Sequence, residues 1–195
     1  MSRKLLTGLV LIFFFSFQLT GQVKYVKLAG MIGRAVYDSK YLTPVDVLTD
    51  YGVDDFYRLG GEFVYEKYLS KVRLSGGTYI ELTRVGADYV SSISVPIGVE
   101  KYILGNDILP LFGVGLNTNI SLSSWSRSNR SNAIVYLSAY AKAGIGRQFK
   151  SYLLQLTGFY QVSLTRTHTG YGLFDYSSRR SAMMFELALF LPLVK

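Results

Sequence analysis

The sequence contains no cysteine and only one histidine among its 195 residues. The lack of cysteine excludes a disulfide framework and a lipoprotein attachment site. One histidine without any cysteine leaves no ligand set for a zinc centre, and no motif indicates another cofactor. A packed core or a membrane must therefore stabilise the chain.

Long apolar runs are missing as well, except at the N-terminus. After residue 21, no segment approaches the ~18 consecutive apolar residues that a transmembrane helix needs. If the mature chain enters a membrane, it does so with strands, because only a closed barrel then satisfies the backbone.

The N-terminal segment has the three parts of a secretory signal. Arg3 and Lys4 form a positive region, Leu5 to Leu19 form an apolar region, and Thr20, Gly21 and Gln22 follow. We predict a signal peptide over residues 1–21 and one mature domain over 22–195, with a retained anchor helix as the alternative. The net charge of +8 favours anionic lipid as a partner, since export argues against nucleic acid.

The mature chain is rich in strand-forming residues, with 16 tyrosines, 12 phenylalanines and 19 glycines. Apolar and polar residues alternate with a period of two along eight segments, as in "KYVKLAGMIGRAVYD" and the closing "SAMMFELALFLPLVK". Long polar links are expected at about 38–55, 123–132 and 165–180. Tight turns are expected near Ser70-Lys71, Gly105-Asn106 and Lys150-Ser151. The short link from Arg84 to Asp88 is the one exception to this alternation of long and short connections.

The second face of these strands decides between a membrane barrel and a soluble one. One face is aliphatic and aromatic, and the other carries charges of both signs. This pattern is the inverse of a soluble barrel and is typical of a membrane barrel with a polar interior. The alternative is a soluble protein whose charged face meets solvent. We predict that the following residues form a luminal charge network: Lys27, Glu62, Glu66, Arg73, Glu81, Glu100, Lys142 and Glu186.

Aromatic residues near the strand ends are expected to form girdles at the membrane interfaces. The candidates are Tyr37, Tyr57, Tyr102, Phe112, Tyr152 and Phe159.

The segment "ISVPIGVEKYILGNDILPLFGVGLNTNISLS" carries a family resemblance in Val95-Pro96, Lys101-Tyr102, Pro110 and the run from Phe112 to Gly115. It resembles the Gram-negative outer-membrane β-barrel family (porin-like, OmpA-type eight-stranded barrels). The resemblance implies an all-β, eight-stranded, antiparallel, up-and-down transmembrane barrel in the outer membrane, while members of the family differ in function. Such barrels usually end on an aromatic residue, whereas this chain ends at Lys195.

A barrel of eight strands has an interior that side chains can fill, so we expect a plugged lumen rather than an open channel. A small-solute pore and a soluble lipocalin-like binding barrel in the periplasm remain as alternatives. The predicted role is structural or binding, carried by the extracellular loops.

The later loops combine arginine with aromatic residues, Trp125 among them. Since arginine binds phosphate in a bidentate manner, lipopolysaccharide phosphates are the expected partner. Solvation, or pairing with the acidic first link, is the alternative. The arginines concerned are Arg127, Arg130, Arg166, Arg179 and Arg180.

Two further groups of residues give only weak indications of a functional site. The first link is acidic, through Asp38, Asp46, Asp50, Asp54 and Asp55, but its spacing is not that of a calcium loop.

His168 lies between Ser163 and Asp175 in the sequence, yet a catalytic triad is defined by geometry and not by such spacing. We therefore expect no metal site and no enzymatic activity.

Overall fold

A computed structural model gives the fold. It describes residues 24–42, 47–67, 72–85, 88–103, 108–121, 135–165, 167–171 and 174–193. Within these ranges, no helix has the length and apolar character needed to cross a membrane. The described residues form nine strands, namely β1 (Tyr25–Leu42), β2 (Val47–Lys67), β3 (Val72–Val85), β4 (Asp88–Tyr102), β5 (Ile108–Ser121), β6 (Val135–Gln148), β7 (Leu153–Ser163), β8 (Thr167–Tyr171) and β9 (Phe174–Pro192).

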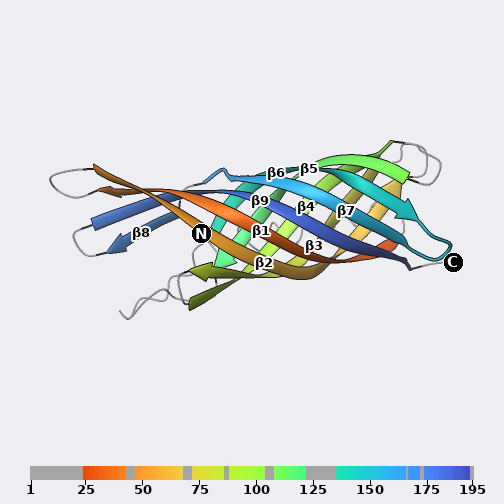
Figure 1. Cartoon of the computed structure of the whole chain (residues 1–195), viewed down its shortest axis with the longest axis horizontal. Helices are drawn as coiled ribbons and strands as arrows, with labels where there is room; N and C mark the ends of the chain where they lie inside the picture. Colours follow the sequence, from red (N-terminus) through yellow and green to blue (C-terminus); the bar gives the residue numbers. More distant parts are fainter. Residues whose placement is uncertain are drawn as a thin grey trace, which may run out of the picture.

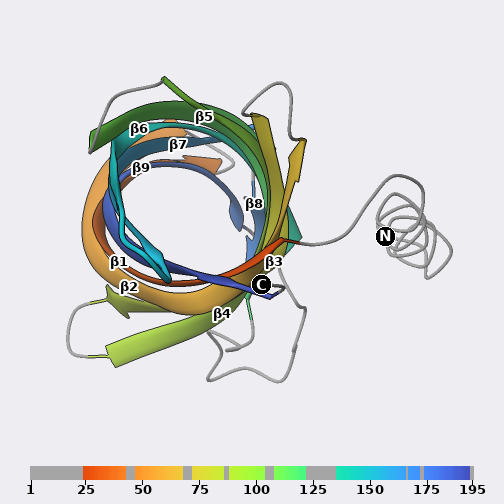
Figure 2. The ribbon, with the colours of Figure 1, turned by 90° about the vertical axis from the view of Figure 1, so that its right-hand side faces the viewer.

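Eight of these strands close into a ring. Each strand pairs with its neighbour in antiparallel fashion in the order β1 to β7 and then β9, and β9 pairs back with β1. Seen along its long axis, the ribbon encircles a central lumen (Figure 2). This topology confirms the predicted all-β, eight-stranded, up-and-down antiparallel barrel.

The strand β8 does not take part in closure, because its described pairing is with the first residues of β9, from Tyr171↔Phe174 to Thr167↔Ser178. The long polar link predicted at 165–180 is therefore wrong over most of its length. A β-hairpin occupies that stretch, since polar side chains do not prevent a backbone ladder from forming.

The link predicted at 38–55 is corrected in the same way. The β1–β2 ladder runs without a break from Tyr25↔Val64 to Leu42↔Val47, whereas the β2–β3 ladder begins only at Phe56↔Thr83. The β1–β2 and β8–β9 hairpins thus extend past the closed ring at one end of the barrel, which we call the loop end (Figure 1). The link at 123–132 lies outside the described residues.

The opposite end, which we call the turn end, carries short connections. In the β6–β7 turn, Phe149 N donates to the Tyr152 carbonyl oxygen at 2.8 Å, and Gln148 Nε2 donates to the carbonyl oxygens of Phe149 and Tyr152. This turn contains the predicted Lys150-Ser151 pair. The turns predicted at Ser70-Lys71 and Gly105-Asn106 lie outside the described residues.

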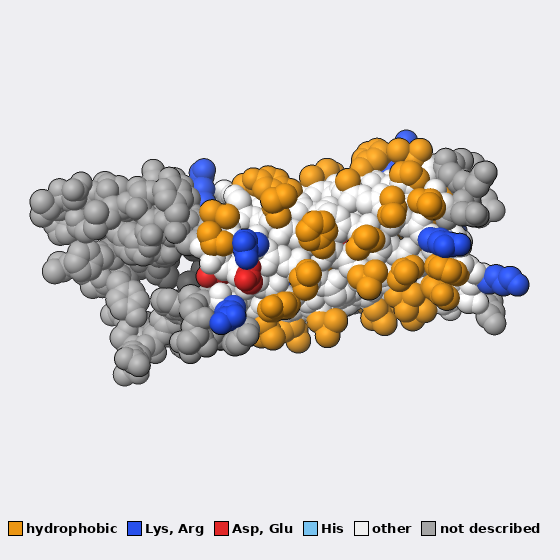
Figure 3. All heavy atoms as spheres, in the orientation of Figure 1, with side chains coloured by type: hydrophobic (Ala, Val, Ile, Leu, Met, Phe, Trp, Pro, Cys, Tyr) orange, Lys and Arg blue, Asp and Glu red, His pale blue; other side chains and the backbone are white. Residues whose placement is uncertain are grey.

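The outer surface of the barrel is apolar. Leu59 is 72% exposed, Met183 66% and Phe185 65%, because odd residues of β2 and β9 point outward while even residues point into the lumen. In the view of Figure 3, apolar side chains cover the middle of the barrel and the visible charged groups gather toward its two ends. A soluble barrel would bury these residues and expose the charged ones.

The residues predicted for the aromatic girdles divide between the two faces of the barrel. Tyr57, Phe112 and Tyr152 are exposed on the outer surface. The prediction is wrong for Tyr102 and Phe159. Their side chains point to the same side as those of Glu100 and Gln161 and are buried in the lumen. The side chain of Tyr37 lies outside the described residues.

Candidate functional site: two side-chain networks in the lumen

The turn-end half of the lumen is organised around Lys27. Its ammonium group lies 2.8 Å from Glu62 Oε1 and 2.8 Å from Glu186 Oε2, which the neighbouring strands β2 and β9 bring to either side of β1. The Tyr79 hydroxyl donates to Glu62 Oε1 at 2.5 Å. The lysine side chain is 1% exposed and that of Glu186 is 0% exposed, so each charge depends on its partners for stabilisation.

The same network continues across the lumen from Glu186. Thr157 donates to Glu186 at 3.2 Å, and Gln155 donates to Thr157. The Tyr102 hydroxyl donates to Gln155 Oε1 at 2.7 Å and lies 3.2 Å from Glu100 Oε1. Glu100 in turn pairs with Lys142 at 2.6 Å. We call this the turn-end network, and its members are Lys27, Glu62, Tyr79, Glu100, Tyr102, Lys142, Gln155, Thr157 and Glu186.

Arg73 lies beside the turn-end network, near the end of the lumen. Its Nε is 3.3 Å from Glu66 Oε1. Its guanidinium carbon lies 4.3 Å from the centre of the Tyr102 ring, 4.9 Å from that of Tyr25 and 5.4 Å from that of Phe190. These aromatic faces favour a cation and close this end of the lumen with bulky side chains.

The loop-end half of the lumen is organised around Glu81. Both Arg58 and Arg180 donate to its carboxylate, the latter at 2.6 Å. Arg180 also donates to the Tyr136 hydroxyl at 2.8 Å, and Arg58 donates to Gln161 at 3.1 Å. From Gln161 the contacts pass to amide and hydroxyl groups of β4, β5 and β6. We call this the loop-end network, and its members are Arg58, Glu81, Ser94, Asn117, Asn119, Tyr136, Ser138, Gln161 and Arg180.

The two networks carry net charges of opposite sign. The loop-end network has two arginines and one glutamate. The turn-end network, taken with the Arg73–Glu66 pair, has three cations and four glutamates. The described ion pairs of the lumen therefore join five cations to five acids, which is the condition for burying so many charges.

The structure places all eight residues of the proposed luminal charge network inside the barrel. Sequence reasoning left Arg58 out of that set, although its position four residues before Glu62 gives it the same phase on β2. The polar residues Asn117, Gln155 and Gln161 show the same alternation, but the predicted set contains only charged residues and so does not include them.

The structure corrects the predicted location of Arg180. The sequence predicts a loop position for Arg180, but β9 begins at Phe174, so Arg180 already belongs to the strand and shares the phase of Glu186. Its side chain is buried and donates to Glu81, which removes it from the proposed lipopolysaccharide contacts. Arg179 is exposed on the outer face, and Arg127, Arg130 and Arg166 lie outside the described residues.

The remaining candidates gain little from the structure. Asp55 pairs with Arg34 at 2.9 Å on the outer surface, and among the described residues no group of acids and histidines could hold a metal ion. Ser163 is buried in the lumen. The side chains of His168 and Asp175 lie outside the described residues.

Comparisons with known proteins bear on the fold. No family model and no curated sequence matches the chain. Among solved structures, Neisserial surface protein A matches with a TM-score of 0.51 at 9% identity, over 82% of this chain and 97% of that one.

Two further structures match with lower TM-scores. The N-terminal β-barrel domain of Pseudomonas aeruginosa OprF has a TM-score of 0.40 at 13% identity, over 80% of this chain and 96% of that one. The attachment invasion locus protein Ail of Yersinia pestis has a TM-score of 0.28 at 12% identity, over 82% and 98%. The match to Neisserial surface protein A, the one of these three with a TM-score above 0.5, supports the eight-stranded barrel fold.

Proposed function

We propose that this protein is an outer-membrane barrel with a polar, plugged lumen, whose role is structural or binding and is carried by its loop end. The observation that carries the proposal is the inverted surface: large apolar side chains outside, and paired charges inside. Large apolar side chains such as Leu59 and Phe185 are exposed on the outer surface. Burying that surface in hydrocarbon is favourable, whereas exposing it to water is not.

The hairpins that extend past the ring at the loop end, together with the wide sequence separation between β5 and β6, support an orientation. Barrels of this kind have short periplasmic turns and longer extracellular loops, so the loop end faces outward and the turn end faces the periplasm. Lys101, Arg147 and Lys150 are exposed near the turn end, where they lie at the level of phospholipid phosphates. In the β6–β7 turn, the rings of Phe149 and Tyr152 stack at 4.7 Å and the Arg147 guanidinium lies 5.4 Å from Phe149, an arrangement suited to a membrane interface.

At the loop end, lipopolysaccharide phosphate is the proposed partner. Arg179 is exposed on the outer face of β9. Arg127, Arg130 and Arg166 are further candidates that the sequence alone predicts. A binding comparison between intact and dephosphorylated lipid A tests this partner. We expect Arg179→Gln to weaken binding of the phosphorylated form, while Lys101→Gln at the opposite end leaves it unchanged. Equal effects of the two substitutions would contradict a loop-end site.

The buried ion pairs inside the barrel argue against the alternative of a small-solute pore. A cavity of about 10 Å³ lies in the middle of the lumen, which is the room that a single water molecule needs. A solute path would require several buried ion pairs to separate at once. Single-channel recording in planar bilayers tests this point. We expect no stepwise conductance from the folded barrel, and steady steps abolished by Lys142→Gln would support the pore instead.

The proposed location is tested by heat-modifiable gel migration of the protein in a washed outer-membrane fraction. A folded membrane barrel resists detergent at room temperature and migrates differently after boiling. We expect such a shift in that fraction. Recovery of an unshifted protein from the soluble periplasm would instead favour the lipocalin-like alternative, which the apolar outer surface opposes.

A further inference from the structure

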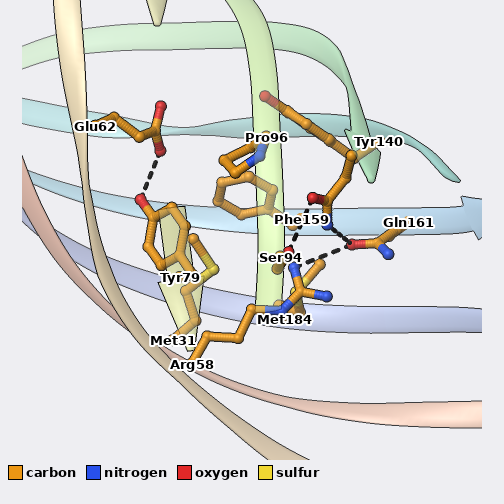
Figure 4. Close-up of a pocket in the computed structure, with 11 residues that line it drawn as sticks. Met31, Arg58, Glu62, Tyr79, Ser94, Pro96, Tyr140, Phe159, Gln161 and Met184 are labelled. Carbon is orange, nitrogen blue, oxygen red and sulfur yellow. Dashed lines mark hydrogen bonds between the residues drawn. The ribbon is translucent and has the colours of Figure 1, made fainter. Parts of the chain in front are cut away.

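The middle of the lumen offers little room for a ligand. Met31, Tyr140 and Phe159 are among the side chains that line a cavity of about 10 Å³ there (Figure 4), which is the room that one water molecule needs. A larger partner meets the outside of the barrel instead. Charged side chains are the groups to consider on that surface, because the rest of it is apolar.

One outward-facing group of charges lies where the β1–β2 hairpin leaves the closed ring. Arg34 of β1 and Asp55 of β2 form an ion pair at 2.9 Å, and their side chains are 68% and 50% exposed. The β2–β3 ladder begins at Phe56↔Thr83, whose side chains are both buried. Asp55 and Arg84 each lie one residue past that pair, so both point outward on neighbouring strands. We call Arg34, Asp55 and Arg84 the outer charge cluster.

The outer charge cluster is set in an apolar surface. The nearest outward residues on both sides of Arg34 and Asp55 along their strands are apolar, as is the nearest one to Arg84 on β3. These exposed neighbours are Ile32, Val36, Val53, Tyr57 and Leu82. In Figure 3, charged side chains of both signs gather at the loop end of the apolar belt. A charge on the lipid-facing side of a barrel is costly near the bilayer midplane and costs little at the interface, so the cluster indicates the level of the headgroups.

Arg34 keeps hydrogen-bond donors for a further partner. Its bond to Asp55 uses Nε alone, and the two terminal nitrogens make no hydrogen bond within the described part of the chain. The edge that carries these nitrogens matches two oxygens of a phosphate group. Arg84 lies on the other side of β2 from Arg34 and adds a second positive charge, so the three side chains together favour an anion.

We propose that the outer charge cluster binds a phosphate group of lipopolysaccharide, with Arg34 and Arg84 on the phosphate and the acyl chains along the apolar neighbours. An amphiphile fits better than free phosphate because the surface beside the charges is apolar. The inference rests on the proposed function, since the loop end lies in the lipopolysaccharide leaflet only in the orientation given above. It adds a site distinct from Arg179, which pairs with Asp38 on β1, about 13 Å along the strand from Arg34.

Asp55 provides a substitution whose effect has the opposite sign. Asp55→Asn keeps an oxygen that accepts from Arg34 Nε and removes the negative charge that repels a phosphate, so lipid A should bind more tightly. Arg34→Gln and Arg84→Gln should each weaken binding about tenfold, which is the usual worth of a hydrogen bond to a charged group. Arg147→Gln is the matched control, because it removes an exposed arginine from the outer face at the turn end.

Native mass spectrometry of the folded barrel, titrated with lipid A or with dephosphorylated lipid A, measures these affinities. Heat-modifiable migration first establishes that each variant is folded. We expect the two losses and the one gain with lipid A, no change in Arg147→Gln, and no effect of any substitution on the dephosphorylated lipid. Wild-type affinity for lipid A in both Arg34→Gln and Arg84→Gln would overturn the site. Equal losses with the dephosphorylated lipid would overturn it as well.

Arg179→Gln separates failure of this site from failure of the proposed function. If it weakens lipid A binding while Arg34→Gln and Arg84→Gln do not, the outer charge cluster is not a lipid site and the loop-end partner stands. If none of the three weakens binding, both proposals are wrong. Wild-type binding of phosphatidylglycerol as tight as that of lipid A would overturn lipopolysaccharide as the ligand. If an arginine variant does not fold, Asp55→Asn decides, and the absence of tighter binding overturns the site.

Discussion

Replacement of Lys27 by methionine is the sharpest test of how the lumen is held together. The substitution shortens the side chain by one heavy atom and removes the one ammonium group that lies 2.8 Å from both Glu62 and Glu186. Two buried carboxylates then face each other across β1 without their shared cation. We expect the barrel to be strongly destabilised.

The magnitude follows from the geometry. At 2.8 Å and an effective dielectric constant of about 20, each contact corresponds to about 6 kcal/mol of Coulomb attraction. Desolvation offsets much of this gain, and removing one partner of a buried ion pair costs about 3–5 kcal/mol in practice. With a urea dependence of about 2 kcal/mol per molar, the unfolding midpoint falls by about 2 M.

Urea unfolding in lipid vesicles, followed by the fraction of protein that keeps its folded gel mobility, measures this shift. Lys101→Met is the matched control, because it removes the same charge from an exposed position on β4. The neutral triple variant Lys27→Met/Glu62→Gln/Glu186→Gln is expected to recover much of the stability, since it leaves no unpaired charge. The reasoning fails if Lys27→Met and Lys101→Met shift the midpoint equally, or if the triple variant is the least stable of the three.

Three further outcomes follow from other parts of the barrel. Gly77→Ala is expected to lower the unfolding midpoint, because the added carbon would overlap the Gly61 carbonyl oxygen on β2, whereas Gly158→Ala meets nothing closer than 3.9 Å and should leave it unchanged. Leu187→Arg places a charge on the outer face and should cost about 2–4 kcal/mol in a vesicle, a loss that a soluble barrel would not show. Asp55→Asn removes an exposed surface ion pair and should leave the midpoint within error of the wild type.

The fold and the polarity of the two faces could be predicted from the sequence because strand alternation has a fixed period. Once Glu186 is placed inside, its neighbours Phe185 and Leu187 must lie outside, and the same argument holds along each strand. Arg58 follows from this logic too. The alternation in β2 places it on the same face as Glu62, although the predicted charge network does not include it.

The sequence could not predict which side chains contact one another across neighbouring strands. That Lys27 meets both Glu62 and Glu186 depends on the register of the β1–β2 hairpin and on the register of β1 with β9, which forms only when the barrel closes. The start of β9 could not be predicted for a different reason. The residues before Arg180 are polar, which is typical of a loop, and hydropathy does not indicate the backbone pairing of this segment with β1 and β8. For that reason Arg180 was assigned to the loop surface.

The most direct test of the central claim asks what the outer surface touches. The chain has no cysteine, so single cysteines introduced as Phe185→Cys, Leu187→Cys and Lys150→Cys can each carry a nitroxide label without further changes. In folded protein in lipid vesicles, we expect the labels at 185 and 187 to collide with dissolved oxygen and not with a water-soluble nickel chelate, and the label at 150 to collide readily with the chelate. If the labels at 185 and 187 meet the chelate as freely as the one at 150, the outer face is in water and the membrane-barrel interpretation is wrong.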